Sequence, residues 1–152
     1  MIKISQACLL SFVFSMVAVI GCGGGSNEEL VDVVPVTGKI TLNGEPLKGA
    51  AITFMPQDEG MGRPCFGATD DDGAYVIKTQ DGRKGCPVGK FKVIISKFAM
   101  EDGTPVGEDP EAAALGMEHL PAQYSSGEQT QLSADVPEGG KTFDFPLEVK
   151  KK

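Results

Sequence analysis

Short stretches of alternating apolar and polar residues, each ended by Gly, Pro, Asn or Asp, recur along this chain from Val36 onward. The first, VTGKITL at residues 36–42, places Val, Ile and Leu side chains on one face and Thr and Lys on the other, which is the period of a half-buried strand. The Asn43-Gly44 pair that follows is a tight-turn signal. The chain has 20 Gly and 10 Pro among its 152 residues, so long helices would be interrupted. The pattern therefore predicts a fold of short strands.

Seven segments of this kind make up the predicted folded part. They span residues 36–42, 50–56, 64–69, 74–79, 89–96, 131–136 and 142–149. Seven short strands at this spacing are typical of an antiparallel β-sandwich. A long polar insertion at 99–124 interrupts them, and Asp109 and Pro110 mark the start of a helix within it. The predicted fold class is all-β, with one short helix in a long loop.

The order in which the turn motifs follow one another is informative. VTGKITLNGEPLKGAAITFMP precedes ATDDDGAYVIKT, then PVGKFKVIISK, and finally LPAQYSSGEQTQLSADVPEGGKTFDFPLEV. Together these stretches, residues 36–149, resemble the carboxypeptidase regulatory-like and transthyretin-like domains, the last stretch in the form found in small bacterial lipoproteins. The resemblance implies a seven-stranded antiparallel transthyretin-like (prealbumin-like, Ig-like) β-sandwich. It also implies a structural, adhesive or regulatory module.

The enzymatic relatives of these domains are hydroxyisourate hydrolases, which use several His and an Arg at the active site and end in Tyr-Arg-Gly-Ser. This chain has a single His, His119, and ends in EVKKK. It contains no G-x-S-x-G motif, no C-x-x-C motif and no glycine-rich loop with the Walker lysine. The sequence therefore predicts no enzymatic activity and no cofactor, and a divergent hydrolase is the less favoured alternative.

The N-terminus predicts an export signal. Residues 7–20, ACLLSFVFSMVAVI, form an uncharged apolar run of 14 residues behind a start that carries Lys3. As a helix this run is about 21 Å long, shorter than the ~30 Å hydrocarbon core of a bilayer. Its length and position are those of a signal peptide, which is predicted at residues 1–21.

The residues at the end of this run narrow the type of signal. VIGC, residues 19–22, has an aliphatic residue, a tolerant position, a small residue and then Cys, and it resembles the lipobox of bacterial lipoprotein precursors. The resemblance implies cleavage between Gly21 and Cys22 and acylation of Cys22, which then anchors the protein in a lipid bilayer. An uncleaved helix and an ordinary secretory signal are the alternatives. The predicted location is the cell envelope, on either the outer or the cytoplasmic membrane.

Composition completes the predicted organisation. Residues 22–35 begin with Cys-Gly-Gly-Gly-Ser-Asn and are predicted to be a flexible tether, whereas residues 150–152 form a basic tail. The formal net charge of −7 disfavours nucleic acid as a partner. An envelope protein or polymer is the predicted partner besides the bilayer. A surface receptor for carbohydrate or peptide is the alternative function.

The cysteines predict a crosslink. Cys8 belongs to the predicted signal peptide and Cys22 to the predicted anchor, so Cys65 and Cys86 remain in the exported domain. Two remaining thiols in an oxidising compartment favour a disulfide. Two buried free thiols and a metal-binding pair are the alternatives. A zinc site would need further Cys or His, and the chain offers only His119.

Asp70, Asp71, Asp72 and Gly73 form the densest acidic motif of the chain. Clustered carboxylates suit calcium, which makes Asp70 and Asp72 a weak calcium candidate. The favoured interpretation is a hairpin turn, in which Asp side chains accept backbone hydrogen bonds and Gly73 takes a positive φ.

Overall fold

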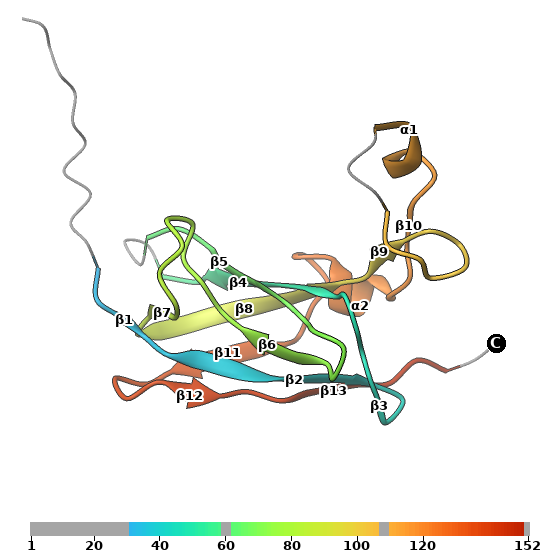
Figure 1. Ribbon diagram of the computed structural model, residues 1–152. Coiled ribbons are helices and arrows are strands. Elements are labelled where there is room, and N and C mark those ends of the chain that lie inside the picture. The colour runs from blue at the N-terminus through green and yellow to red at the C-terminus, as the bar shows by residue number, and fades with distance from the viewer. Residues whose placement is uncertain (1–30, 59–61, 107–109, 151–152) are drawn as a thin grey trace, which may run out of the picture.

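The computed structural model describes residues 31–58, 62–106 and 110–150 (Figure 1). The predicted signal peptide, the lipidation site Cys22, residues 22–30 of the predicted tether and the last two residues of the basic tail lie outside these ranges. The elements are β1 (Val33–Val34), β2 (Val36–Leu42), β3 (Glu45–Pro46), β4 (Ala51–Pro56), β5 (Cys65–Ala68), β6 (Ala74–Val76), β7 (Cys86–Pro87), β8 (Gly89–Ser96), β9 (Phe98–Ala99), α1 (Pro110–Ala113), β10 (Met117–Glu118), α2 (Ala122–Ser125), β11 (Ser133–Val136), β12 (Lys141–Thr142) and β13 (Phe145–Leu147). Strands predominate, so the all-β prediction is confirmed.

One layer is a four-stranded antiparallel sheet with the strand order β11-β8-β4-β5. Its longest pairing joins β4 to β8 over six residues, from Ala51 opposite Ser96 to Pro56 opposite Phe91. The predicted strand 89–96 coincides with β8, whose side chains alternate between the core and the outer face. This sheet therefore follows the period that the sequence predicts.

The second layer is built around β2. One edge of β2 pairs antiparallel with β6 and β3, and the other edge pairs with β12 and β13. β12 and β13 run parallel to β2, with Lys141 opposite Val36 and Phe145 opposite Ile40. The prediction of antiparallel pairing throughout is therefore wrong at this edge. The reason is the connection: the chain crosses from β11 in the first sheet to the second sheet, and a crossover allows parallel pairing.

The predicted strand 142–149 is divided into β12 and β13. Between them, the Asp144 carboxylate accepts a hydrogen bond from the Lys39 N–H at 2.9 Å, and the Phe143 N–H donates to the Thr37 carbonyl at 2.8 Å. The Asp144 side chain thus takes the place of one backbone hydrogen-bond acceptor in the pairing with β2. β13 also contains Pro146, whose missing N–H is tolerated because β13 pairs only with β2 in the described part of the chain.

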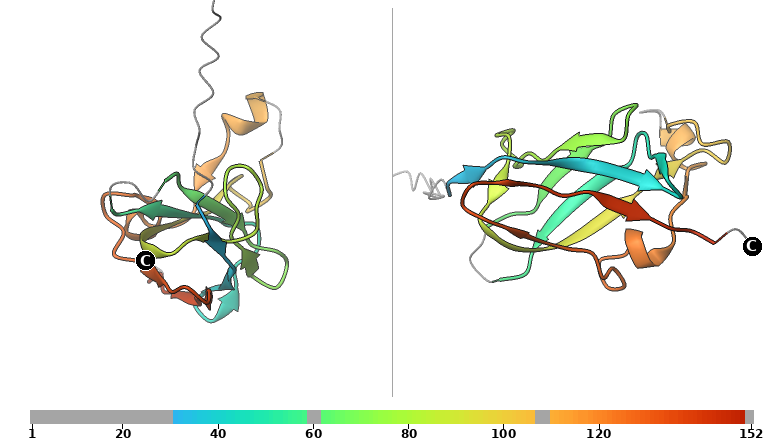
Figure 2. Two further views of the ribbon diagram at one scale, coloured as in Figure 1. Left: turned by 90° about the vertical axis from the view of Figure 1, so that its left-hand side faces the viewer. Right: turned by 90° about the horizontal axis from the view of Figure 1, so that it is seen from below.

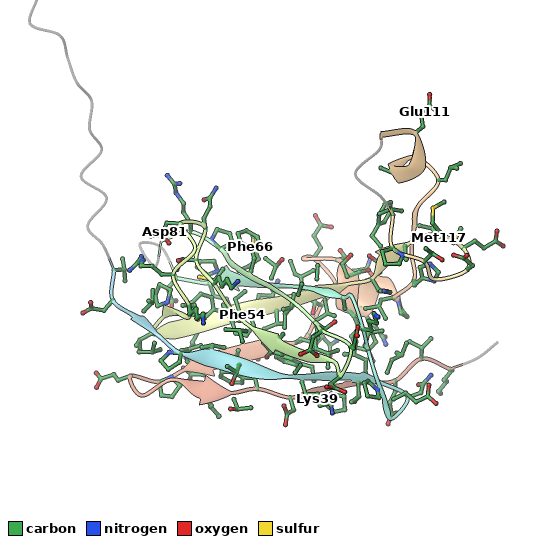
Figure 3. The ribbon with its side chains drawn as sticks, in the orientation of Figure 1. Lys39, Phe54, Phe66, Asp81, Glu111 and Met117 are labelled. Atoms are coloured by element: carbon green, nitrogen blue, oxygen red, sulfur yellow. The ribbon has the colours of Figure 1, made fainter. Side chains whose placement is uncertain are left out.

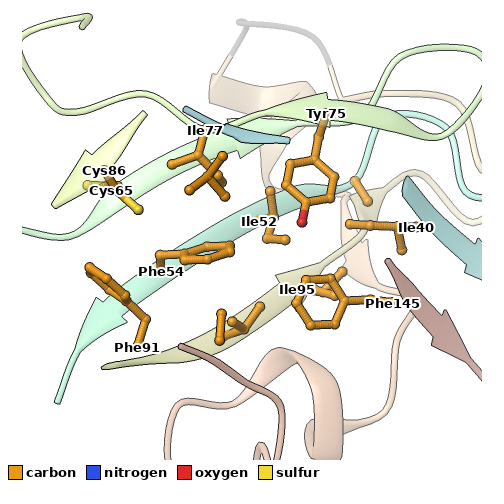
Figure 4. Packing of buried hydrophobic residues seen from close by; sticks show 14 of the residues in the cluster. Ile40, Ile52, Phe54, Cys65, Tyr75, Ile77, Cys86, Phe91, Ile95 and Phe145 are labelled. Atoms are coloured by element: carbon orange, nitrogen blue, oxygen red, sulfur yellow. The ribbon is translucent and has the colours of Figure 1, made fainter. Parts of the chain in front are cut away.

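The hydrophobic core lies between the two sheets, which face each other in Figure 2. Phe54 of the first sheet packs against Phe91 and Phe143, with ring centroids 5.7 and 6.2 Å apart. Tyr75 and Phe145 of the second sheet stack at 6.5 Å (Figure 4). The side chains that alternation directs inward are therefore the ones that form the core.

Residues 98–119 are referred to here as the arm. Its described parts, 98–106 and 110–119, project from one end of the two sheets (Figures 1 and 2). β9 and β10 pair antiparallel at its base, and α1 lies near its tip. α1 begins at Pro110, where a helix is predicted, but it is a single turn and the chain returns as a strand at Met117. The second short helix, α2, is not predicted by the sequence. Neither helix is long and apolar enough to cross a membrane, and the described ranges hold no other.

The opposite end of the molecule is where the described chain begins. β1 pairs with β7, with Val34 opposite Cys86, and the Pro35 carbonyl accepts a hydrogen bond from the Lys141 N–H. A Cβ added at Gly85 would lie 2.2 Å from the Val34 carbonyl oxygen, so β1 can approach this closely only because residue 85 is glycine. The folded part therefore includes residues that the sequence assigns to the tether.

Candidate functional site

Cys65 and Cys86 are brought together in the core. Cys65 begins β5 and lies opposite Phe54, whereas Cys86 begins β7 and lies opposite Val34. The two cysteines are 1% and 0% exposed, and their side chains are adjacent (Figure 4). Both thiols are free in this structure. The two residues that the sequence predicts as a pair are thus neighbours in space.

The two thiols shift each other's pKa. The side-chain interaction with Cys86 lowers the pKa of Cys65, against the opposing effects of burial and of the Asp81 charge. The interaction with Cys65, together with burial, raises the pKa of Cys86. Cys65 also makes a long contact, 3.9 Å, with the Arg63 carbonyl oxygen. Both cysteines are shielded from solvent in the folded protein.

The Asp-rich motif forms the tight turn that connects β5 with β6. Asp70 Oδ1 accepts hydrogen bonds from the N–H groups of Asp72 and Ala74, at 3.0 and 2.9 Å. Gly73 has a φ of +72°, and a Cβ there would lie 2.5 Å from the Ile40 carbonyl oxygen. The acidic side chain and the glycine therefore both serve the turn geometry.

The weak calcium candidate gains no support from this geometry. One oxygen of Asp70 already accepts two backbone hydrogen bonds, and Asp71 forms an ion pair with Lys48 at 2.5 Å. Among residues 31–58, 62–106 and 110–150, no group of three or more His, Cys, Asp or Glu is arranged to hold a metal ion.

His119 lies at the base of the arm. Its Nε2 is 2.7 Å from the Met100 carbonyl oxygen. Beside it, the Glu118 carboxylate accepts hydrogen bonds from the N–H groups of Lys97 and Leu120, at 2.8 and 2.9 Å. The Glu118 contacts join the base of the arm to the residues that flank it, whereas the His119 contact lies within the arm.

The core holds one large side chain with a polar end. Tyr75 is 3% exposed and donates a hydrogen bond to the Phe143 carbonyl at 2.7 Å. Burial raises the pKa of this phenol, with a further contribution from the Asp144 charge. Every buried side-chain nitrogen and oxygen of the described residues has a hydrogen-bond partner. The polar groups of the core thus form hydrogen bonds that stabilise the fold.

The outer face of the four-stranded sheet carries apolar side chains. Phe66 and Met55 are 45% and 38% exposed there, and Phe66 and Ile94 both lie opposite Thr53, in one row across three strands. An open hollow of about 540 Å³ on this face is lined by Met55, Pro56, Gln57, Lys92, Ile94 and Gly127. In the sequence, this apolar outer face is indicated by Ile94, which is apolar at an outward position of GKFKVIIS.

Four basic residues gather where the described chain begins; they are referred to as the tether-end surface and comprise Arg63, Lys78, Arg83 and Lys84. Lys78 is bridged to Phe66 on one side and to Lys84 on the other. Arg83 donates a hydrogen bond to the Val31 carbonyl at 2.9 Å, and Arg63 donates to Gln80 at 3.3 Å. Lys78, Arg83 and Lys84 are close in the sequence, and the fold adds Arg63 to them.

The arm carries the opposite charge. Residues 98–119 include six Asp or Glu and no Lys or Arg. Large apolar side chains are also exposed there, with Leu115 at 68% and Phe98 and Met117 at 48%. The arm is thus acidic and partly apolar, and Figure 3 labels Glu111 and Met117 on it.

These features are not matched by known relatives from which a function could be transferred. No protein-family model, no curated protein and no solved structure matches this chain.

Proposed function

We propose that this protein is a non-enzymatic lipoprotein of the cell envelope. In this proposal acylated Cys22 anchors it in a membrane, and residues beyond the tether fold as a transthyretin-like β-sandwich that acts as a structural or binding module. The VIGC motif supports the anchor. Two facing sheets whose main strands follow the predicted order, apart from the parallel edge of β2, support the fold.

One observation carries the proposal: the apolar run and the folded part are separated at Cys22. The run ends one residue before Gly21, and the first strand begins at Val33. Between them lie mostly Gly, Ser, Asn and acidic residues, which have no apolar surface to bury. An acyl group on Cys22 would therefore anchor the protein without disturbing its core.

Metabolic labelling with a clickable fatty acid tests the anchor. We expect label on the full chain and its loss in Cys22→Ala. Cys8→Ala is the matched control, because Cys8 lies in the part that is removed, and it should be labelled like the natural chain. Label that persists in Cys22→Ala would refute the proposal.

The arm supports the binding part of the proposal. Leu115 and Met117 are more exposed than large apolar side chains usually are when they serve only the fold, and Glu118 fixes the base of the arm. Exposed apolar side chains that gather on one element are typical of protein-binding surfaces. We therefore assign partner binding to the arm.

Formaldehyde crosslinking in cells tests this assignment. The natural chain should give a defined adduct that is lost in the double variant Leu115→Ser/Met117→Ser. Met55→Ser, which changes an exposed apolar side chain outside the arm, should leave the adduct unchanged. An adduct that survives the arm variant would contradict the assignment.

A further inference from the structure

β1 and β7 form a two-stranded sheet of their own, referred to here as the small sheet. It lies at the end of the molecule where the described chain begins (Figure 1). Among the described residues, neither strand pairs with a strand of the two larger sheets. Each strand has only two residues, and a two-stranded pair of this size is marginally stable on its own. The small sheet therefore depends on other contacts to stay in place.

Backbone hydrogen bonds join the residues next to the small sheet to the rest of the fold. The Gly85 N–H, directly before β7, donates to the Ile77 carbonyl at 2.7 Å. The Lys141 N–H donates to the carbonyl of Pro35, directly after β1, at 3.1 Å. β1 and β7 can therefore open together without loss of any strand pairing in the larger sheets.

Cys86 is the point at which the small sheet meets the four-stranded sheet. It is 0% exposed and adjacent to Cys65 (Figure 4), and Cys65 lies in β5, opposite Phe54 of β4. A bond between the two sulfurs would link β7 covalently to β5 and close the loop from residue 65 to residue 86. A crosslink of this kind opposes opening of the segment that it closes.

We propose that Cys65 and Cys86 form a redox-operated clamp on the small sheet. When the disulfide is formed, β7 and its partner β1 are held on the four-stranded sheet. When the two thiols are reduced, the small sheet opens and residues 31–34 join the tether. These residues extend to at most about 14 Å, so the redox state sets how far the folded part can stand from Cys22. This last consequence rests on the proposed lipid anchor, whereas the clamp itself does not.

The bond forms by exchange with an external disulfide. The Cys65 thiolate, which the lowered pKa favours, attacks one sulfur of that disulfide and releases the other as a thiolate. The Cys86 thiol then loses its proton, and its sulfur attacks the Cys65 sulfur and releases the second thiolate. Each released thiolate takes up a proton in place of the one that a cysteine has lost. The cysteine pair thus loses two electrons, and the external disulfide gains them and becomes two thiols.

The clamp controls access to its own sulfurs. Cys65 and Cys86 are 1% and 0% exposed, so an external disulfide or thiol reaches them only during local opening. Opening of the small sheet moves Cys86 away from the core. The bond therefore forms, and is reduced, through the same motion that it suppresses.

Hydrogen exchange of the full chain, read by mass spectrometry, tests the clamp. One sample is treated with oxidised glutathione and a second with dithiothreitol. We expect peptides that cover residues 31–35 and 79–87 to exchange about tenfold faster in the reduced sample. Over the same minutes the peptides of β8 should stay protected in both samples, because their exchange requires the larger sheets to unfold.

Three variants provide the controls. Cys65→Ala and Cys86→Ala cannot form the bridge, so residues 31–35 should exchange at the same rate after either treatment. Each comparison is made within one protein, so the packing change that the substitution causes does not affect it. Cys22→Ala lacks the proposed acylation site and should respond to the two treatments like the natural chain.

Two free thiols at Cys65 and Cys86 after treatment with oxidised glutathione would overturn the inference. A bridge that leaves the exchange of residues 31–35 unchanged would also overturn it. So would loss of protection in β8 together with β1, because reduction would then unfold the whole domain. The intact mass reports acylation of Cys22 separately, which distinguishes a failed anchor from a failed clamp.

Discussion

The two sheets and the arm use the same kinds of apolar side chain in opposite ways. Phe54 is fully buried where β4 pairs with β8 over six residues, whereas Phe98 is 48% exposed where β9 pairs with β10 over two. In the sheets, each inward side chain meets a facing layer. In the described part of the arm, Phe98 and Met117 remain 48% exposed, and polar contacts to Glu118 fix its base. Alternation thus buries a side chain only where a second layer covers it.

The largest expected effect is a loss of stability in the core, and the same substitution in the arm should cost much less. Phe54→Ala should lower the free energy of unfolding by about 4 kcal/mol, because it removes ring contacts with Phe91 and Phe143 and leaves a cavity. Phe98→Ala, in the arm, should cost less than about 1 kcal/mol. Urea unfolding of both variants checks the contrast. Equal losses would mean that the arm is as integral to the fold as the core.

The predicted Cys65–Cys86 disulfide would lie in the hydrophobic core. Its reduction should cost about 3 kcal/mol of stability through loop-closure entropy, without changing hydrogen exchange in the arm. Unfolding with and without reductant measures the loss. The double variant Cys65→Ala/Cys86→Ala should not respond to reductant. Alkylation of two thiols after acid denaturation of the isolated protein would show that no bridge exists.

Two glycines, one in the sheets and one in the arm, differ in how much space they leave for an added methyl group. A Cβ at Gly38 would lie 1.8 Å from the Phe143 carbonyl oxygen, so Gly38→Ala must displace backbone and should cost about 2 kcal/mol or more. A Cβ at Gly116 meets the ends of the Phe98 and Val106 side chains, at 2.5 and 2.6 Å, which can turn away. Thermal unfolding should show Gly116→Ala within about 1 kcal/mol of the natural chain.

The sheets should be sensitive to alkaline pH through Tyr75. Its pKa is raised above the ordinary value of 10.0, so the unfolded chain releases this proton first and stability falls as the pH rises beyond about 10. Tyr75→Phe should remove that slope, and it should cost about 1 kcal/mol at neutral pH through the lost hydrogen bond to the Phe143 carbonyl. Denaturant midpoints between pH 8 and 12 test both effects. If Tyr75→Phe leaves the slope of stability against pH unchanged, a group other than Tyr75 causes the alkaline sensitivity.

The stability of the turn in the arm should depend on pH in the acid range, and this is the smallest of the expected effects. The Thr104 N–H donates to Asp102 and lowers the pKa of this carboxyl below 3.8, so the turn is stabilised above that pH and loses this contribution as the pH falls through the lowered pKa. Asp102→Asn should abolish the acid-dependent shift of the Thr104 amide resonance. The core amides of β8 serve as the control and should not shift in this range.

Local pattern was sufficient to predict the strands but not their partners. β8 has the bounds that alternation predicts, because Gly89 and the following polar-apolar sequence define it without reference to other strands. The direction of β12 depends on a crossover between sheets, which no local pattern encodes. β9 and β10 pair over only two residues each, too few for a period to be recognised.

The candidate sites also differ in whether the local sequence predicts them or only the fold brings them together. The turn at Asp70 is a local structure, and its residue types predict it. Cys65 and Cys86 were predicted as a pair because they are the two cysteines that remain in the predicted exported domain, and they are adjacent in the core. The tether-end surface was not predicted, because Arg63 lies in a different segment from Lys78 and Lys84 and reaches them through its hydrogen bond to Gln80.

The parallel edge of β2 also determines when the domain can finish folding. The hydrogen bond from Lys39 to Asp144 joins residues 105 positions apart, and β2 keeps an unpaired edge until residues 141–147 have been synthesised. Contacts of such long range form slowly, and an unpaired edge strand is a template for misplaced pairing. The fold therefore closes only when residues 141–147 are available to pair with β2.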